Sequence, residues 1–290
     1  MISFIIPFAT KNKNLYNWKD TDNSFIILCT LLVIQNINKK CKLDKEIILV
    51  DNTNTFPDVK IKNLKIVKGI QHLSEETILN NKDYEKYKID NFNNHSMWAA
   101  MAYNIGLNHA KGDYIILQHN DLFYHNDFFN NLIKLLDTNE YVSVDSKKIS
   151  LSGYVSNKSI FDNLNIDFRI GHEDGGYLKT PQLGLADAFF FLCKKSFFDD
   201  YHVDWDYGDT NHGATIKCLN NEKSFVHLGP YFHNPNFKTE GTHTYQYEGK
   251  DFATHLKGGF SEMKLSFKLY NNDLHMDESN YFIKNLIKSL

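Results

Sequence analysis

Short, mostly apolar runs in the first half of the chain predict buried β-strands. Each run is followed at once by turn-forming or polar side chains, a pattern typical of strands covered on both faces. Pro7 is expected to end the first strand, because proline removes a backbone donor. The predicted strands lie at Phe4–Ile6, Glu46–Val50, Leu64–Val67 and Tyr114–Leu117.

Segments with helical periodicity alternate with these strands. Residues 21–24 offer capping side chains for a helix that runs to about Asn38. Ser96 can cap the next helix, in which Met97, Met101 and Ile105 fall on one face. This alternation predicts an α/β fold of Rossmann-like architecture, with a mixed, mainly parallel sheet and helices on both faces.

The second half is expected to extend the same sheet. A helix is predicted over Phe128–Leu136, and strands over Tyr141–Val144 and Ala186–Lys194. No linker or repeat divides the halves, so a single domain is expected over residues 1–260, with a nucleotide-binding half (1–125) and an acceptor half (126–260). Residues 261–290 are predicted to form a C-terminal helical extension.

Composition and charge narrow the possible partners. The 290-residue chain is 42% hydrophobic and 23% charged, as ordinary globular proteins are, and its net charge of -3 disfavours nucleic acid as a partner. Arg169 is the only arginine, so diphosphate recognition would rely on lysine, backbone amides or a metal. The four cysteines form no CxxC pair, and no apolar run is long enough to span a bilayer. A cytoplasmic protein with reduced cysteines and no transmembrane segment is expected.

Polar residues follow two of the predicted strands. Asp51 comes directly after the second strand, and His119-Asn120-Asp121 follow the fourth. The carboxyl ends of parallel strands share one edge of a sheet, so these side chains can share a crevice. In extended backbone, His119 and Asp121 would face one cation, with Asn120 turned away toward a nucleotide. An imidazole ligand favours Mn²⁺ over Mg²⁺.

The same residues also have simpler interpretations. His119 could hydrogen-bond a neighbour while Asp121 caps the following loop, and Asp51 could form a turn with Asn52. The aromatic ring of Phe8 is predicted to offer a flat apolar surface against which a nucleotide base could stack.

Four segments of the first half stand in a characteristic order and spacing: Ser3–Pro7, Glu46–Thr53, Asn104–Gly106 and Ala110–Ile115. With these landmarks the chain resembles family 2 glycosyltransferases with the GT-A fold. In that family the first strand tip and the aspartate after the second strand hold the nucleotide, so the resemblance implies Pro7, Phe8, Ala9 and Asp51 as contacts. An Asp-x-Asp motif normally stands where this chain has His119-Asn120-Asp121, so histidine replaces the first aspartate.

The resemblance also implies functional residues in the second half. An acidic pair at the start of a helix matches Asp206 and Asp209, and Asp209 is favoured as the catalytic base because it sits beside small neighbours at the expected helix N-cap. An aspartate there could equally serve only as a cap. A histidine that reaches the metal matches His233, with His255 as the alternative.

These features together predict a metal-dependent glycosyltransferase. It would move a sugar from a nucleotide-diphosphate donor, most simply a UDP-sugar, onto a glycan or other hydroxyl acceptor with inversion, an aspartate acting as base. A catalytically silent sugar- or nucleotide-binding protein with the same fold is the alternative, because of His119 and the interrupted acidic pair. A nucleotidyltransferase is less consistent, because no glycine-rich phosphate loop follows the first strand.

Overall fold

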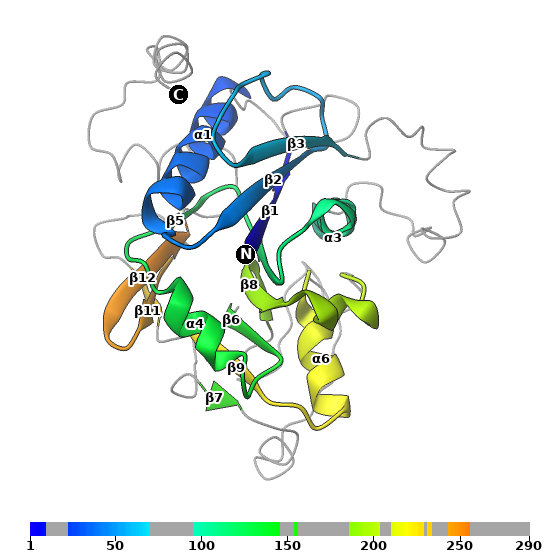
Figure 1. The fold of residues 1–290 in the computed structure, drawn as a ribbon, viewed down its shortest axis with the longest axis vertical. Coiled ribbons are helices and arrows are strands. Elements are labelled where there is room, and N and C mark those ends of the chain that lie inside the picture. Colours follow the sequence, from blue (N-terminus) through cyan, green and yellow to red (C-terminus); the bar gives the residue numbers. More distant parts are fainter. Residues whose placement is uncertain are drawn as a thin grey trace.

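A computed structural model describes residues 1–9, 23–69, 95–145, 154–155, 186–203, 210–228, 231–233 and 243–255 of the chain. The described part consists of a large mixed sheet, a smaller antiparallel sheet and the helices that pack against them (Figure 1). The expected acidic pair, Asp206 and Asp209, lies outside the described residues, and so does the predicted C-terminal extension over residues 261–290.

The large sheet has eight strands in the order β3-β2-β1-β4-β8-β6-β9-β7. Neighbouring strands are parallel in the pairs β3-β2, β2-β1, β1-β4 and β6-β9, and antiparallel in the other pairs. The predicted mixed, mainly parallel sheet is confirmed, and strands from the second half do extend it. Its strands are β1 (Ile2–Phe8), β2 (Lys45–Asp51), β3 (Leu64–Lys68), β4 (Tyr114–Gln118), β6 (Tyr141–Asp145), β7 (Tyr154–Val155), β8 (Ala186–Lys194) and β9 (Phe225–Leu228).

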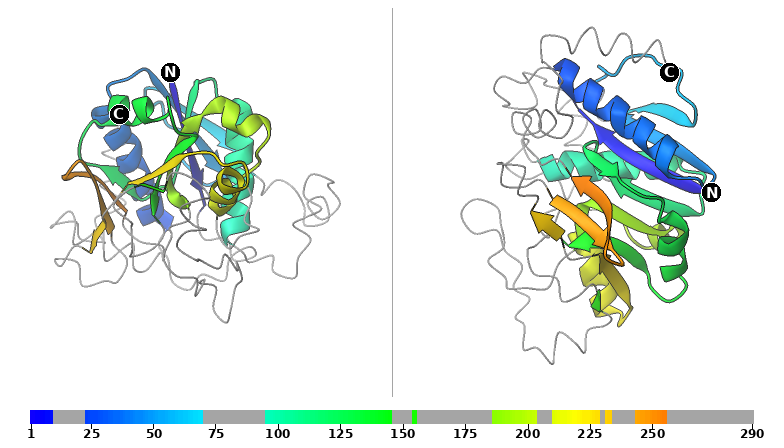
Figure 2. Two further views of the ribbon diagram at one scale, coloured as in Figure 1. Left: turned by 90° about the horizontal axis from the view of Figure 1, so that it is seen from below. Right: turned by 90° about the vertical axis from the view of Figure 1, so that its left-hand side faces the viewer.

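Helices cover both faces of this sheet, as predicted. Helices α1 (Asn23–Lys40) and α4 (Phe129–Leu135) contribute to the core on one face. Helices α3 (His95–His109) and α6 (His212–Asn220) contribute to the core on the other. A short 3-10 helix, η3 (Lys195–Asp199), follows β8. Two views at right angles show the helices on either side of the sheet (Figure 2).

Pro7 does not end the first strand, contrary to the prediction, because β1 continues to Phe8. Its neighbours explain why proline is tolerated. Ile2 donates to Asp44 and Phe8 accepts from Asn52, so the even-numbered residues of β1 hydrogen-bond toward β2. Pro7 therefore faces the β4 side, where the β1-β4 ladder has already ended at Ile5, and its missing N–H leaves no gap in the ladder.

The smaller sheet joins the carboxyl end of β4 to the last described part of the chain. Its order is β10-β11-β12-β5, and every pair is antiparallel. Tyr124 of β5 and Phe252 of β12 belong to the same core as α1 and α4. The strands are β5 (Leu122–Tyr124), β10 (Tyr231–His233), β11 (His243–Tyr247) and β12 (Lys250–His255).

Within the described residues, no helix has both the length and the apolar character that a membrane span requires. All four cysteines are buried and unpaired, which agrees with the expected reduced state.

Candidate metal centre

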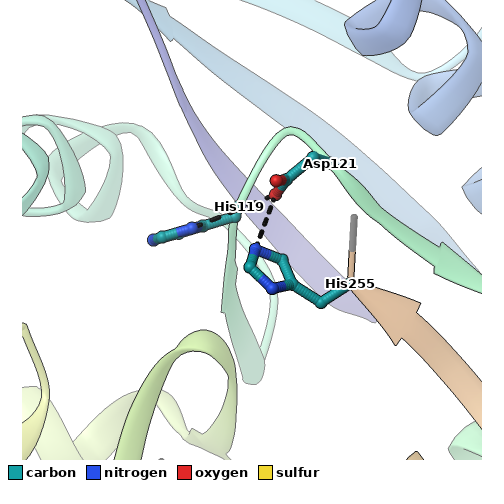
Figure 3. Close-up of side chains that lie close together, drawn as sticks. All are labelled: His119, Asp121 and His255. Carbon is teal, nitrogen blue, oxygen red and sulfur yellow. Dashed lines mark ion pairs between the residues drawn. The ribbon is translucent and has the colours of Figure 1, made fainter. Parts of the chain in front are cut away.

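The turn after β4 carries the first two residues of the site. Strand β4 is almost wholly buried and ends at Gln118, so the chain must leave the core there. Asn120 and Asp121 form a turn rather than the expected extended segment, and β5 begins at Leu122. The carboxylate of Asp121 nevertheless lies near the imidazole of His119, and a dashed line joins the two side chains (Figure 3).

The third residue comes from the other end of the described chain. Strand β12 pairs with β5, and His255 lies opposite Leu122 in the register. This pairing places His255 beside Asp121, the residue that precedes β5. His255 was predicted only as the alternative to His233, and the structure brings His255 into the cluster.

The three side chains converge on a small volume. His255 Nε2 lies 3.1 Å from Asp121 Oδ1, and His119 Nδ1 lies 4.0 Å from the same oxygen. One ligand atom of each residue lies within 4.8 Å of those of the other two. The imidazole planes are inclined at 64° to each other (Figure 3). Two nitrogens and one carboxylate oxygen therefore face a common point.

Burial makes this arrangement costly without a further partner. His255 is 0% exposed and Asp121 is 2% exposed, whereas His119 remains partly open. His255 Nε2 and Asp121 Oδ1 are in contact at 3.1 Å. Among the residues that the structure describes, neither of these atoms nor His255 Nδ1 has a hydrogen-bond partner that meets the usual geometry. Buried polar atoms without partners are rare in proteins and often mark the place of an ion.

The electrostatics of the cluster favour an ionised carboxylate. Burial alone would raise the pKa of Asp121, but the nearby imidazoles of His255 and His119 outweigh it and hold that pKa below its usual value. A metal needs a deprotonated carboxylate, so Asp121 is prepared to bind one at neutral pH.

The donor set fits a divalent transition ion. Two adjacent ligands on an octahedral ion with bonds of about 2.2 Å lie about 3.1 Å apart, which matches the separation of His255 Nε2 and Asp121 Oδ1. Two imidazoles and one carboxylate suit manganese or a similar ion better than magnesium, which prefers oxygen ligands.

Cys29 of α1 lies near the turn that carries two residues of the cluster. Burial, and secondarily the charge of Asp121, raise the pKa of its thiol well above the usual value. Its Sγ contacts the carbonyl oxygen of Asn120 at 3.7 Å. The Asn120 side chain donates to Thr30 Oγ1 of the same helix.

Asp51 organises the loop that follows β2. One oxygen, Oδ1, accepts from the backbone N–H and the hydroxyl of Thr53, and Oδ2 accepts from the backbone N–H of Phe56. This is the turn-forming role considered for Asp51 from the sequence. A carboxylate has about four acceptor positions, and the described residues occupy three of those of Asp51.

The first strand tip offers backbone rather than side-chain surface. Phe8 is 1% exposed and packs edge-on against Phe56 at 4.9 Å between centroids, so its ring gives no open face for stacking a base. That part of the sequence interpretation is wrong. Any nucleotide contact by Pro7 and Phe8 would come from their backbone, with the partly exposed Ala9 beside them.

The ends of the segment that carries Asp206 and Asp209 are held to the rest of the fold. Asn104 of α3 accepts from the backbone N–H of Val203 and donates to its carbonyl, so one amide side chain fixes the residue before this segment. On the far side, Thr210 is buried just before α6.

His233 ends β10, and its side chain is outside the described part of the structure. Its backbone pairs with His243, which in turn pairs with His255. The three histidines thus occupy one row of the smaller sheet, a register that sequence spacing did not reveal.

A mixed, mainly parallel sheet of this order, with helices on both faces and polar residues where its strands end, is that of an α/β protein of the GT-A type. The family model described as glycosyl transferase family 2 matches residues 29–201. The chain belongs to this family, and the predicted family and fold are confirmed.

Several solved structures are similar to this chain at low sequence identity. A mannosyltransferase from Pyrobaculum calidifontis, in complex with GDP-mannose and Mn²⁺, is 14% identical, with a TM-score of 0.40 over 78% of this chain and 54% of that chain. TarS from S. aureus is 11% identical, with a TM-score of 0.42 over 99% of this chain and 42% of that chain. The galactosyltransferase LgtC is 10% identical, with a TM-score of 0.44 over 97% of this chain and 99% of that chain.

The chain thus spans about half of the length of the first two of these proteins. None of the curated proteins matches the sequence.

Proposed function

We propose that the chain is a metal-dependent glycosyltransferase that moves a sugar from a nucleotide-diphosphate donor onto a hydroxyl acceptor. The observation that carries this proposal is the convergence of His119, Asp121 and His255, in which the facing atoms of the buried Asp121 and His255 have no hydrogen-bond partner among the described residues. Membership of family 2 supports the reaction class. The donor is proposed to be a UDP-sugar, the ion Mn²⁺ and the outcome inversion, in a cytoplasmic protein whose buried cysteines stay reduced.

Each part of the carboxyl edge has a task in this proposal. His119, Asp121 and His255 hold the ion, which when bound would neutralise the charge that develops on the leaving diphosphate. The remaining acceptor position of Asp51 takes an N–H of the base, and backbone groups of Pro7, Phe8 and Ala9, with Asn120, border the nucleotide. His233 is a further candidate ligand from the same row as His255.

The acceptor hydroxyl must lose a proton as it attacks the sugar. We assign this proton to Asp209, with Asp206 as the alternative. The anchoring of Val203 by Asn104 supports a fixed starting point for the segment that contains both. Substituting each aspartate with asparagine, and measuring turnover apart from Mn²⁺ and UDP binding, tests the assignment. Full turnover by both variants would reject it.

The metal site itself is tested by titrating Mn²⁺ in the presence of UDP with the wild-type chain, Asp121→Asn and His255→Gln. Both variants are expected to bind Mn²⁺ at least about tenfold more weakly, because each loses one of three protein ligands. Asp113→Asn is the matched control, since Asp113 directly precedes β4 at the opposite end of that strand and its side chain is 81% exposed. Equal Mn²⁺ affinity in Asp121→Asn and Asp113→Asn would refute the site.

The alternative function is a silent nucleotide- or sugar-binding protein. It is favoured by the replacement of an aspartate by His119, which leaves one carboxylate in the cluster. UDP and Mn²⁺ binding without any transfer or donor hydrolysis, across a panel of nucleotide sugars, would favour this alternative over the enzyme.

A further inference from the structure

Phe189 of β8 contacts both imidazoles of the cluster. Its ring lies nearly parallel to that of His255, with centroids 3.5 Å apart and planes 19° apart. It meets the ring of His119 edge to face, at 5.0 Å and 73°. One aromatic side chain therefore borders two of the three candidate ligands.

The backbone of Phe189 also fixes the start of the metal-binding turn. Strands β8 and β4 are antiparallel, with Phe190 opposite Gln118, the last residue of β4. One step further, the backbone N–H of His119 donates to the carbonyl oxygen of Phe189 at 3.3 Å. The β8 strand thus continues to guide the chain after β4 has ended.

Metal-binding histidines are usually oriented by a hydrogen bond from their second ring nitrogen to a carboxylate, a carbonyl or water. That bond fixes both the tautomer and the plane of the ring. The described part of the chain offers His255 no such bond, because its buried Nδ1 has no hydrogen-bond partner there. Another feature must hold the ring if His255 is to bind an ion through Nε2.

We propose that Phe189 is the positioning residue of this site and replaces the missing hydrogen bond by stacking. A metal binds to the lone pair in the plane of the imidazole, so the position of that plane decides whether Nε2 can reach the ion. A ring stacked on one face blocks rotation of His255 about its Cβ–Cγ bond and leaves the in-plane nitrogens free. The edge-to-face contact with Phe189 also restricts the rotation of the His119 ring. This inference rests on the proposed metal site.

Three variants of the full-length chain test the proposal. Phe189→Leu keeps an apolar side chain but removes the flat ring, and Phe189→Tyr restores a ring. Phe128→Leu is the matched control, because Phe128 is also a half-buried phenylalanine but packs against Tyr247 and Phe252, away from the cluster. Each protein is titrated with Mn²⁺, and its Co²⁺ form is examined by visible absorption, which reports ligand geometry.

Phe189→Leu is expected to bind Mn²⁺ about tenfold or more weakly, the usual effect of losing an orienting partner. Its Co²⁺ spectrum should change, whereas Phe189→Tyr and Phe128→Leu should keep the wild-type spectrum and affinity within about twofold. A lower melting temperature alone, with unchanged affinity and spectrum, would show a merely structural role and overturn the proposal. Phe189→Met, with a flexible apolar side chain, gives the same comparison if Phe189→Leu does not fold.

The outcome separates this inference from the proposed function. If the wild-type chain binds neither Mn²⁺ nor Co²⁺, the metal site and the positioning role both fail. If the wild-type chain binds them and Phe189→Leu binds equally well with the same spectrum, the metal site stands and the role of Phe189 is rejected.

Discussion

Replacing Gly106 with alanine sets two physical effects of opposite sign against each other. Gly106 lies in helix α3, where alanine is favoured over glycine by about 1 kcal/mol. It also faces the central strands. A Cβ at this position would lie 2.2 Å from Ile5 Cγ2 and 3.2 Å from Val50 Cγ2.

The steric effect should win. Normal contact begins at 3.4 Å, so the added carbon and Ile5 Cγ2 must separate by at least 1.2 Å (3.4 minus 2.2). Ile5 is fully buried on β1, between β2 and β4, and cannot move toward solvent. Overpacking of this kind costs about 3 kcal/mol, which leaves a net loss of about 2 kcal/mol after the helical gain. The melting temperature should fall by about 4–8 °C.

Urea denaturation of the metal-free protein measures this change. Asn108→Ala is the control, because Asn108 is exposed on the same helix and its replacement brings only the helical gain. The double variant Gly106→Ala with Ile5→Ala should lose less stability than the sum of the single variants, because truncating Ile5 removes the clashing carbon. If Gly106→Ala is as stable as the wild-type chain or more stable, the close packing of α3 on β1 is wrong.

Two further predictions concern other parts of the fold. Asn104→Ala should lower the free energy of unfolding by about 1–3 kcal/mol, because it removes both hydrogen bonds to the Val203 backbone. The variant should also have reduced turnover. An unchanged urea midpoint would contradict the stability prediction. Burial raises the pKa of the Cys41 thiol from 9.0 to about 11. The folded state therefore keeps this proton at pH values where the unfolded state has already released it. The contribution of the Cys41 thiol to the free energy of unfolding is thus complete below pH 9 and is lost as the pH rises to about 11. Between pH 8 and pH 10.5 the urea midpoint should fall less in Cys41→Ala than in the wild-type chain. An equal fall in both proteins would show that Cys41 does not have the raised pKa.

The strands and helices were predictable because their signals are local. Strands β2 and β8 follow from continuous apolar runs, and the predicted bounds of β8 agree with the structure. The prediction that Pro7 ends the first strand was wrong, because the effect of a proline depends on which side of β1 needs a backbone donor. Only the strand register shows which side that is. The prediction of an open stacking surface at Phe8 failed for a similar reason, since the sequence does not show that the ring of Phe56 packs against that of Phe8.

The candidate site was predictable only in part. His119 and Asp121 are close in sequence, so the alternation of polar groups at a strand end was enough to pair them. His255 joins them through the β5-β12 pairing, a contact between segments more than 100 residues apart. Several histidines in the second half could have filled this place, and local patterns do not distinguish among them. Phe189 carried no signal at all, because an aromatic residue within an apolar strand is expected to be core.

Three of the landmark residues, Ser3, Glu46 and Gly112, lie at or near the amino ends of the strands, opposite the candidate site. Ser3 Oγ donates to Glu46 Oε1 at 2.6 Å and accepts from the Gly112 N–H at 2.8 Å, and the same oxygen of Glu46 accepts from the Lys111 N–H. A Cβ on Gly112 would lie 2.7 Å from the Ser3 nitrogen, so this close approach requires glycine. These bonds align β1, β2 and β4 with one another at their amino ends. They therefore also determine the relative positions of the carboxyl ends of these strands. Since this task does not depend on the ligands at the other edge, histidine can replace an aspartate at position 119 without disturbing the features by which the fold is identified.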